Sequence, residues 1–293
     1  MELGFLVSIP MERKSLTRLR PVTSRQNQTI KSLRDAFAHS GVTANGLYAI
    51  EGVRMVEDAI EAGWKLRVLA FSESARGLAE PMLDMVDEDT ECIVVPDDVF
   101  QSAVATESPQ GVAALIERKL KSGDELLHRG MKLAVVAVGI QDPGNLGTII
   151  RSAEAFHADH VLLTENTVSV WNPKAVRASA GSVLRLACFQ MKAVETLKQL
   201  KTLKVRCVGT SSHGKKSISQ CDLHGPLALY IGNESAGLPT SILNELDELV
   251  TIPHESAVES LNAGAAASIA LYEIARQRSE QPPLQRQEKR KSK

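Results

Sequence analysis

The order of apolar and polar positions along the 293-residue chain predicts two successive α/β units. In the first unit, helical spacing of apolar side chains predicts one helix over 24–40, with Ser24 as its N-cap, and a second over 52–62. Short apolar runs predict strands at 47–50, 66–71, 92–95 and 111–116. This unit is expected to end near Lys119, where a polar and charged stretch begins.

The second unit begins with the apolar run 133–140, whose β-branched residues are typical of a central strand in a parallel sheet. A helix is expected over 145–156, where apolar side chains recur on one face, and an Ala-rich helix over 261–276. Further strands are expected at 160–164, 205–209, 227–232 and 249–253. Strands that alternate with helices predict an α/β fold whose parallel sheet is covered on both faces.

The composition is that of an ordinary globular protein, with 43% hydrophobic and 24% charged residues. The longest apolar run, 133–140, is too short to span a bilayer, so no membrane association is expected. The first ten residues lack the basic region of a secretory signal. We therefore expect a cytoplasmic protein.

The cysteines and histidines do not predict a metal site. Four cysteines stand far apart without a CxxC pair, and the histidines are scattered. We expect reduced, buried thiols and no bound metal.

Charge is distributed unevenly, although the net charge is only −1. Residues 11–34 hold seven Lys or Arg against one Glu, and residues 276–293 hold seven against two acids. The part between them, 35–275, holds 20 basic and 31 acidic residues. Basic ends on an acidic body fit arms that contact a polyanion, and they fit solubilising tails equally well.

Two glycine-containing loops that follow strands lack the features of nucleotide sites. The glycines of loop 139–151 do not have the GxGxxG spacing of a dinucleotide fold. Loop 209–217 nearly matches a phosphate-binding loop, but Lys216 stands where Ser or Thr must reach magnesium. The residues after it do not predict a helix, so a nucleotide-hydrolysing enzyme is disfavoured.

Two further loops carry polar residues among small ones. Asn233 and Glu234 stand between glycines after a predicted strand, which suits either a ligand site or a capped glycine turn. The loop after the last strand enters the final helix through Ser260 and Asn262, and Ser260 is also a candidate N-cap. Asp142 and Glu234 are candidates for a carboxylate pair, but the sequence does not place them together.

Three segments, taken in order, resemble the signature of the SpoU (TrmH-type) RNA ribose 2′-O-methyltransferases of the SPOUT superfamily. They are DPGNLGTIIRSAEAFHADHVLL (142–163), LALYIGNESAGLP (227–239) and VTIPHESAVESLNAGAAASIALYE (250–273). The amino-terminal part, from SRQNQTIKSLRDAF onward, resembles the substrate-binding domain of many members, which is similar to a ribosomal protein. The resemblance covers nearly all of residues 24–277.

The resemblance implies a carboxy-terminal parallel-sheet SPOUT domain with a deep trefoil knot and a smaller amino-terminal α/β domain. It also implies S-adenosylmethionine as cofactor, and a homodimer whose active site draws on both subunits. The expected divisions are a basic arm (1–22), an RNA substrate-binding domain (23–119), a linker (120–131), the SPOUT domain (132–278) and a basic disordered tail (279–293).

The resemblance also implies which residues form the site. The family's characteristic polar, catalytic positions fall on Asn145, Arg151, Glu234, Ser260 and Asn262. Its cofactor-binding loops include Thr210, Gly232, Ile252 and Leu261. The chain departs from the usual sequence pattern of the family at His157 and at Ala263-Gly264. These departures are expected to affect the fit of the cofactor more than the catalytic chemistry. For RNA contact we expect Arg25, Lys31, Arg54, Lys174, Arg177 and Arg185.

The expected activity is S-adenosylmethionine-dependent methylation of a ribose 2′-hydroxyl in RNA, with ribosomal RNA favoured over transfer RNA. A guanidinium is not deprotonated in proteins, so we expect Arg151 to bind the adjacent phosphate and the developing alkoxide. For Arg151 alone, a surface salt bridge is the simpler alternative. For the whole chain, the alternative is a non-catalytic RNA-binding protein with a vestigial knot domain.

Overall fold

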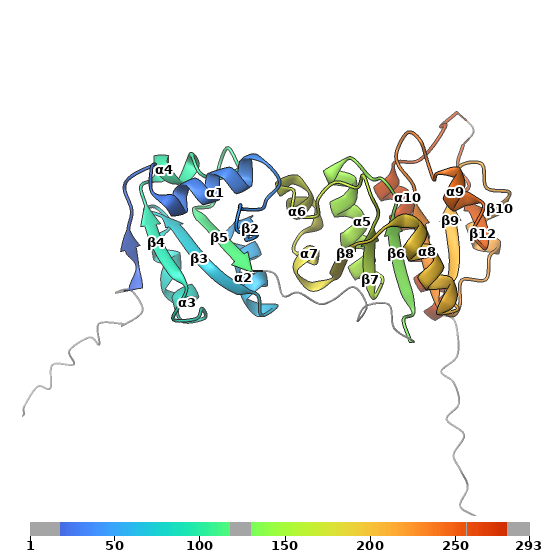
Figure 1. Cartoon of the computed structure of the whole chain (residues 1–293), viewed down its shortest axis with the longest axis horizontal. Helices are drawn as coiled ribbons and strands as arrows, with labels where there is room; N and C mark the ends of the chain where they lie inside the picture. The colour runs from blue at the N-terminus through green and yellow to red at the C-terminus, as the bar shows by residue number, and fades with distance from the viewer. Residues whose placement is uncertain (1–17, 118–129, 256, 280–293) are drawn as a thin grey trace, which may run out of the picture. The chain divides into compact units, whose positions relative to one another are not determined.

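The computed structural model describes residues 18–117, 130–255 and 257–279. The chain divides into two compact units, Met1–Lys119 (unit 1) and Leu120–Lys293 (unit 2), each with its own sheet (Figure 1). Most of the arm expected at 1–22, of the linker expected at 120–131 and of the tail expected at 279–293 lies outside the described residues.

Unit 1 contains a five-stranded mixed sheet in the order β1-β4-β3-β5-β2. Strand β5 runs antiparallel to both of its neighbours, whereas β1, β4 and β3 are parallel. The four expected strands are confirmed, and the short β1 was not expected. The strands are β1 (Arg20–Pro21), β2 (Tyr48–Glu51), β3 (Lys65–Ser72), β4 (Glu91–Val95) and β5 (Val112–Glu117).

Helices cover the sheet of unit 1, and one of them begins later than expected. Ile30 and Leu33 of the first helix and Phe100 of the fourth pack into the core against the sheet. The expected cap at Ser24 is wrong: Asn27 caps the first helix, because its side chain accepts the Thr29 N–H at 2.9 Å. The helices are α1 (Gln28–Ala38), α2 (Val53–Glu61), the 3₁₀ helix η2 (Arg76–Leu78), α3 (Ala79–Leu83) and α4 (Asp97–Gln101).

Unit 2 contains a seven-stranded sheet in the order β10-β12-β9-β11-β6-β7-β8. Every pair of neighbouring strands is parallel, which confirms the predicted fold class. Strands β8 and β10 were not expected. The strands are β6 (Leu133–Ala137), β7 (His160–Leu163), β8 (Ala187–Gln190), β9 (Arg206–Thr210), β10 (Lys216–Ser217), β11 (Leu227–Ile231) and β12 (Glu248–Thr251).

Helices lie on both faces of this sheet, as predicted (Figure 1). Leu197, Leu200 and Ile242 pack with Val136 in the core of one face. The helices at the start and end of the unit pack against each other over the other face. The helices are α5 (Pro143–Ala155), α6 (Pro173–Ser179), α7 (Ser182–Arg185), α8 (Ala193–Thr202), η4 (Ile218–Gln220), α9 (Thr240–Leu243) and α10 (Ala263–Ser279).

The two helices that carry predicted site residues begin at side-chain caps. Asp142 caps α5 by accepting the Asn145 N–H at 2.8 Å, and the proline at its first position has no N–H to satisfy. Asn262 accepts the Ala265 N–H at 3.1 Å at the start of α10. The alternative that Ser260 caps α10 is therefore wrong, since the helix begins at Ala263, three residues beyond that position.

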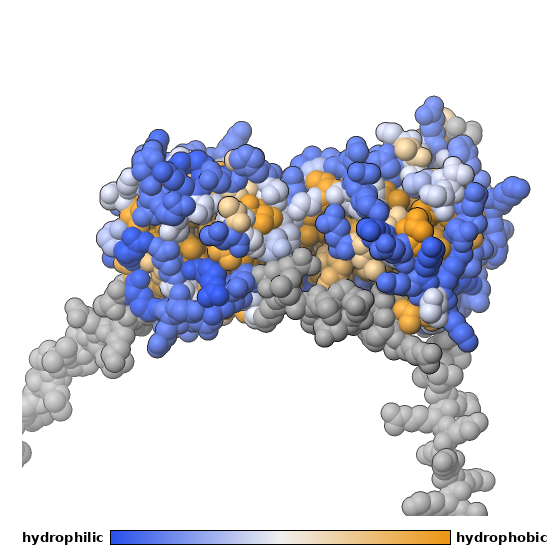
Figure 2. Space-filling model, viewed as in Figure 1, coloured by the Kyte–Doolittle hydropathy of each residue, from blue (hydrophilic) through white to orange (hydrophobic). Residues whose placement is uncertain are grey.

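In the view of Figure 2, most of the visible surface of each unit is hydrophilic, with smaller hydrophobic patches between. Among the described residues, we find no helix that is both long and apolar enough to cross a membrane. All four cysteines are free thiols, of which Cys92, Cys207 and Cys221 are buried. Cys188 is only half-buried, contrary to expectation, because β8 is the edge strand of its sheet.

Helices α5 and α6 approach each other closely at Gly147. A Cβ atom on this glycine would lie 2.5 Å from both the Ala175 carbonyl oxygen and the Ala178 Cβ, and 2.9 Å from the Ser179 nitrogen. Two of these atoms belong to the backbone of α6, so a side chain at this position forces the helices apart.

We expect Gly147→Ala to lower the free energy of unfolding of unit 2 by about 1–3 kcal/mol, the usual cost of overpacking a core. Urea unfolding followed by the fluorescence of Trp171, in a Trp64→Phe background, measures this change. Helix propensity alone favours alanine by about 1 kcal/mol. An increase in stability would therefore contradict the close approach of the two helices.

Candidate functional site

A cavity of about 300 Å³ lies at the carboxyl ends of β9, β11 and β12. Residues from three loops and from the start of α10 form its wall. The loop residues lie within 210–213, 231–238 and 251–261. Ligands of parallel α/β sheets bind at this edge, and cavities that hold small molecules begin at about this volume. The cavity is therefore the candidate ligand site of unit 2.

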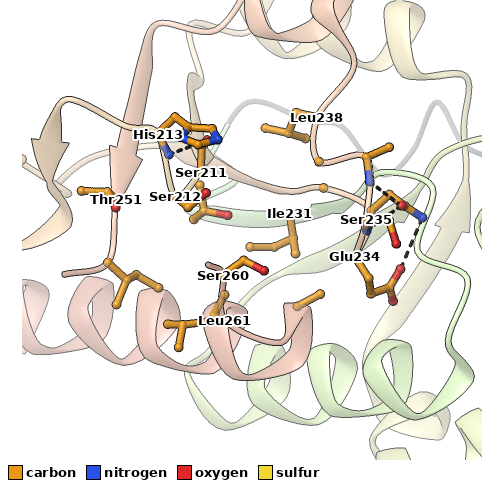
Figure 3. Close-up of a pocket in the computed structure, with 18 of the residues that line it drawn as sticks. Ser211, Ser212, His213, Ile231, Glu234, Ser235, Leu238, Thr251, Ser260 and Leu261 are labelled. Carbon is orange, nitrogen blue, oxygen red and sulfur yellow. Dashed lines mark hydrogen bonds between the residues drawn. The ribbon is translucent and has the colours of Figure 1, made fainter. Parts of the chain in front are cut away.

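The cavity wall includes six residues that the family signature singles out. They are Thr210, Gly232, Glu234, Ile252, Ser260 and Leu261. In Figure 3 the Ser260 side chain points into the middle of the cavity, with Glu234 towards one end and Ser211 and His213 towards the other. Leu238, Ile231 and Leu261 provide apolar surface between these polar ends.

A chain of hydrogen bonds joins three of the predicted polar residues. The Asn145 side-chain amide donates to Glu234 Oε1 at 2.9 Å, and the Asn262 amide donates to Asn145 Oδ1 at 2.7 Å. These residues come from the start of α5, the loop after β11 and the cap of α10. The network thus fixes the relative positions of the three segments beside the cavity.

The loop after β11 is held in a tight turn by Asn233. Its amide donates to the Gly139 carbonyl at 2.8 Å, while its Oδ1 accepts the N–H groups of Ser235 and Ala236 at 3.0 and 2.9 Å. Gly232 packs against the returning strand of the turn, because a Cβ there would lie 2.5 Å from the Gly237 carbonyl carbon. The sequence left open whether Asn233 belongs to a ligand site or to a capped glycine turn, and the hydrogen bonds of its side chain are those of the turn.

Glu234 accepts hydrogen bonds from several donors and stays ionised. Partial burial alone would raise the pKa of Glu234. The hydrogen bonds from Asn145 and from the backbone N–H groups of Gln141 and Asp142 outweigh burial and lower this pKa below its usual value. A carboxylate in this state orients donors and attracts positive charge, and it is not a proton donor at neutral pH.

The pH dependence of stability tests this assignment with Glu234→Gln. Because the folded pKa is lowered, ionised Glu234 stabilises the fold fully above its unfolded pKa of about 4.3. This stabilisation is lost as the pH falls through the folded pKa. We expect the variant to be less stable than the wild type at pH 7 in urea unfolding, and we expect this difference to shrink as the pH is lowered below the unfolded pKa. A stability difference that does not change with pH would contradict it.

Asp142 and Glu234 do not form an acid–base pair. The Asp142 carboxylate caps α5 and accepts from Lys174 Nζ at 3.3 Å, and only the Asp142 backbone N–H faces Glu234, at 3.4 Å. The hydrogen bonds from Asn145 and Lys174 lower the pKa of Asp142, which is therefore ionised as well.

The segment that resembles a phosphate-binding loop contributes to the same cavity. Ser211, Ser212 and His213 line it, and sequence reasoning did not assign them to a site. Lys216 instead pairs with Glu248 at 2.7 Å, and a single 3₁₀ turn follows it. The helix amino terminus that a phosphate loop requires is absent from this described segment.

Arg151 is exposed on α5 and is not among the residues that line the cavity. Within the part of the chain that the structure describes, its guanidinium forms no ion pair, so the alternative of a salt bridge within unit 2 receives no support. Arg151 thus presents on the surface a charge that no described acidic residue neutralises.

The residues expected to contact RNA fall into two groups. Arg25, Lys174 and Arg185 pair with Asp98, Asp142 and Glu154 at 2.5, 3.3 and 2.6 Å. Lys31, Arg54 and Arg177 make no side-chain ion pair with any described residue, and Arg54 and Arg177 are exposed. The second group has more charge available for an anionic partner, because the three cations of the first group are already paired with carboxylates.

Comparison with known proteins agrees with this arrangement. Residues 132–272 match the model of the SpoU rRNA Methylase family, and residues 27–114 match that of an MRM3-like substrate binding domain. The 23S rRNA (uridine(2479)-2′-O)-methyltransferase of Streptomyces viridochromogenes is 33% identical, over 80% of this chain and 85% of that protein. The 23S rRNA (guanosine(2553)-2′-O)-methyltransferase RlmP of Bacillus subtilis is 27% identical, over 87% and 99%.

A solved structure also resembles the whole architecture. The SpoU methyltransferase AviRb from Streptomyces viridochromogenes, in complex with AdoMet, superposes with a TM-score of 0.79 and 29% identity. The match covers 88% of this chain and all of that chain. With the parallel sheet, the polar network beside the cavity and both family models in agreement, the chain belongs to the SpoU rRNA methylase family.

Proposed function

We propose that this protein methylates a ribose 2′-hydroxyl of ribosomal RNA with S-adenosylmethionine as the methyl donor. The observation that carries the proposal is the hydrogen-bonded chain Asn262–Asn145–Glu234, which holds Glu234 in the wall of a cavity at the carboxyl edge of the unit 2 sheet. Ribosomal RNA is favoured over transfer RNA because the two curated relatives above carry 23S rRNA in their names.

The residues of the cavity fit S-adenosylmethionine in size and in chemistry. Thr210, Gly232, Ile252 and Leu261 would hold it through hydroxyl, backbone and apolar surface, within about 300 Å³. The ionised Glu234 at one end suits a ligand that carries positive charge. When bound, the cofactor supplies an electrophilic methyl group on a sulfonium sulfur.

The residues of this chain have distinct tasks in the proposal. Arg151 binds the phosphate next to the target ribose and stabilises the developing alkoxide, and the proton leaves to phosphate or water. Asn145, Glu234 and Asn262 hold one another and orient the nucleotide, since in-line displacement requires a fixed approach. Ser260 points into the cavity and would hold the ribose.

We further propose a homodimer in which Arg151 serves the cavity of the partner subunit. Arg151 is exposed and is not part of its own cavity wall. Helix α10, which packs against α5, carries two exposed apolar side chains, Ile269 and Tyr272, which are 42% and 56% exposed. Tyr272 packs edge-on against Phe156, with ring centroids 6.1 Å apart. Contiguous apolar surface of this kind suits burial in a subunit interface.

A deep trefoil knot also belongs to the proposal. Strand β11 lies between β6 and β9, although it follows β9 in the chain, and β12 lies beyond β9. We expect the connections of these strands to cross at the edge that holds the cavity, as a knot requires, although crossed connections are rare in α/β sheets.

We propose that the protein acts in the cytoplasm, where bacterial ribosomes are assembled.

In RNA binding, we expect Lys31, Arg54 and Arg177 to contribute more affinity than the paired Arg25, Lys174 and Arg185. The domain divisions given above correspond to an RNA-binding part in unit 1 and a catalytic part in unit 2.

Incubation of the purified protein with 23S rRNA and S-adenosylmethionine tests the proposed activity. Nuclease digestion and mass spectrometry are expected to reveal one new 2′-O-methylated nucleotide. RNA binding without any methylated product would instead favour the non-catalytic RNA-binding protein. Methylation of a base rather than a ribose would contradict the proposed chemistry.

A further inference from the structure

The surface charge of unit 1 is opposite to what a broad RNA-binding face requires. Residues 18–117 contain nine Lys or Arg against sixteen Asp or Glu. A polyanion gains most of its affinity from cations that neutralise its phosphates. RNA can therefore approach this unit only where cations are free of acidic partners.

Most of the nine cations are already engaged. Arg20, Arg25, Lys65 and Arg67 form ion pairs with acidic side chains of unit 1. Arg18 and Arg34 have no acidic partner among the described residues, but they are only partly exposed and their guanidinium groups are held by backbone carbonyls. The remaining cations in the described part of unit 1 are Lys31, Arg54 and Arg76, and of these the two arginines are exposed.

The two exposed arginines follow strands that end at the same edge of the sheet. Glu51 at the end of β2 pairs with Ala113 of β5, which in turn pairs with Ala70 near the end of β3. Arg54 is the second residue of α2, three residues after the end of β2, and Arg76 begins η2, four residues after the end of β3. Since only β5 separates these strands, both arginines project from one end of the β3-β5-β2 half of the sheet.

The segment before β5 fills the space between them. Gln110 is exposed, and its Oε1 accepts the Val53 N–H at 3.0 Å, which fixes the start of α2 beside β5. Gly111 lies against Ser72 and Ala75, because a Cβ there would overlap Ser72 Oγ and lie 2.5 Å from Ala75 Cβ. Gln110 is thus placed between the start of α2 and the loop that leads to Arg76.

The other half of the same edge is less suited to RNA. There the Arg25 charge is matched by Asp98, and Asp97 is held by the N–H and hydroxyl of Ser74. The hydrogen bonds from Ser74 lower the pKa of Asp97, which keeps it anionic. Glu73 is also exposed, in the loop between β3 and Arg76. These carboxylates make the side of the sheet beyond Arg76 unfavourable for RNA, so the contact extends from Arg76 towards Arg54.

We infer that Arg54, Gln110 and Arg76 form the surface through which unit 1 contacts the sugar–phosphate backbone of the RNA substrate. We refer to these three residues as the β3-β5-β2 edge, after the three strands near whose shared end they lie. The inference rests on the proposed function, because it assumes that the substrate is RNA. Arg76 was not expected from the sequence, whereas Arg25 was expected and is excluded here by its ion pair.

Filter binding of radiolabelled 23S rRNA transcript to the full chain, from 50 to 200 mM salt, tests the inference. The variants are Arg54→Ala, Arg76→Ala and the double variant, with Arg67→Ala as control, since Arg67 is paired with Asp89 and Glu117. Each edge variant is expected to reduce the slope of log K against log salt by about 1, and the double variant by about 2. The control is expected to bind within twofold of the wild type.

Three results would overturn the inference. The first is an unchanged salt slope in the double variant, and the second is an equal loss of affinity in Arg67→Ala. The third is equally effective competition by polyglutamate of matched charge, which would make the edge a general anion site. Affinity for S-adenosylmethionine, measured on the same variants, should remain unchanged. If wild-type protein methylates 23S rRNA while the double variant binds it normally, only this inference fails and the proposed function stands.

Discussion

Replacing Arg151 with alanine is expected to lower the rate constant of methyl transfer about 10²- to 10³-fold and to leave the Kd for S-adenosylmethionine within twofold. A preorganised positive group that stabilises an oxyanion in the transition state contributes about this much to catalysis. Arg151 lies outside the cavity wall and pairs with no described acid, so its loss should disturb neither cofactor binding nor folding. Single-turnover transfer to 23S rRNA and calorimetry with the cofactor measure the two quantities.

Two further variants show whether the effect is specific to Arg151 and whether it depends on the shape of the guanidinium group as well as on its charge. Lys198→Ala removes an exposed cation from α8 and is expected to transfer methyl groups at the wild-type rate. Arg151→Lys keeps the charge but loses the bidentate fork, and is expected to recover only part of the activity. Wild-type transfer by Arg151→Ala would remove this residue from the mechanism.

Replacing Gly232 with alanine is expected to weaken S-adenosylmethionine binding at least 100-fold, which corresponds to about 2.7 kcal/mol. The added Cβ would lie 2.5 Å from the Gly237 carbonyl carbon and 2.6 Å from the Leu238 nitrogen. Both atoms belong to backbone that forms the cavity wall, so the loop must open and displace its neighbours. Calorimetric titration with the cofactor measures the loss.

The matched control for this change is Gly77→Ala. A Cβ at Gly77 meets nothing within 4 Å, and its φ lies outside the left-handed region. This variant should bind the cofactor as the wild type does. If Gly232→Ala retained wild-type affinity while its melting temperature also stayed constant, the loop after β11 would not be the cofactor site.

The regular framework could be predicted from sequence because its strands are long apolar runs. Val135, Val136 and Leu229 belong to strands that are buried on both faces, and such runs are unambiguous. Helices α6 and α7 were missed, because two left-handed residues, Ala180 and Gly181, interrupt their periodicity. Their conformation depends on packing against Gly147, which lies about thirty residues away in the chain and leaves no local signal.

The candidate site was predictable only through the family signature. Asn145 is hydrogen-bonded to Glu234 and to Asn262, which are 89 and 117 residues away from it in the sequence. The periodicity of apolar residues carries no information about contacts between such distant positions. Local rules misassigned one role, since they offered Ser260 as the helix cap that Asn262 provides. The cap and the network need the same asparagine: its Oδ1 accepts from α10 while its amide donates to Asn145.

A crystal structure of the full chain soaked with S-adenosylmethionine tests the central claim most directly. The account predicts density for the cofactor between the loops of Thr210, Gly232 and Leu261, with its methyl group directed towards the Asn145–Glu234 side of the cavity. Density for the cofactor elsewhere on the chain, or an empty cavity at a saturating concentration, would contradict it.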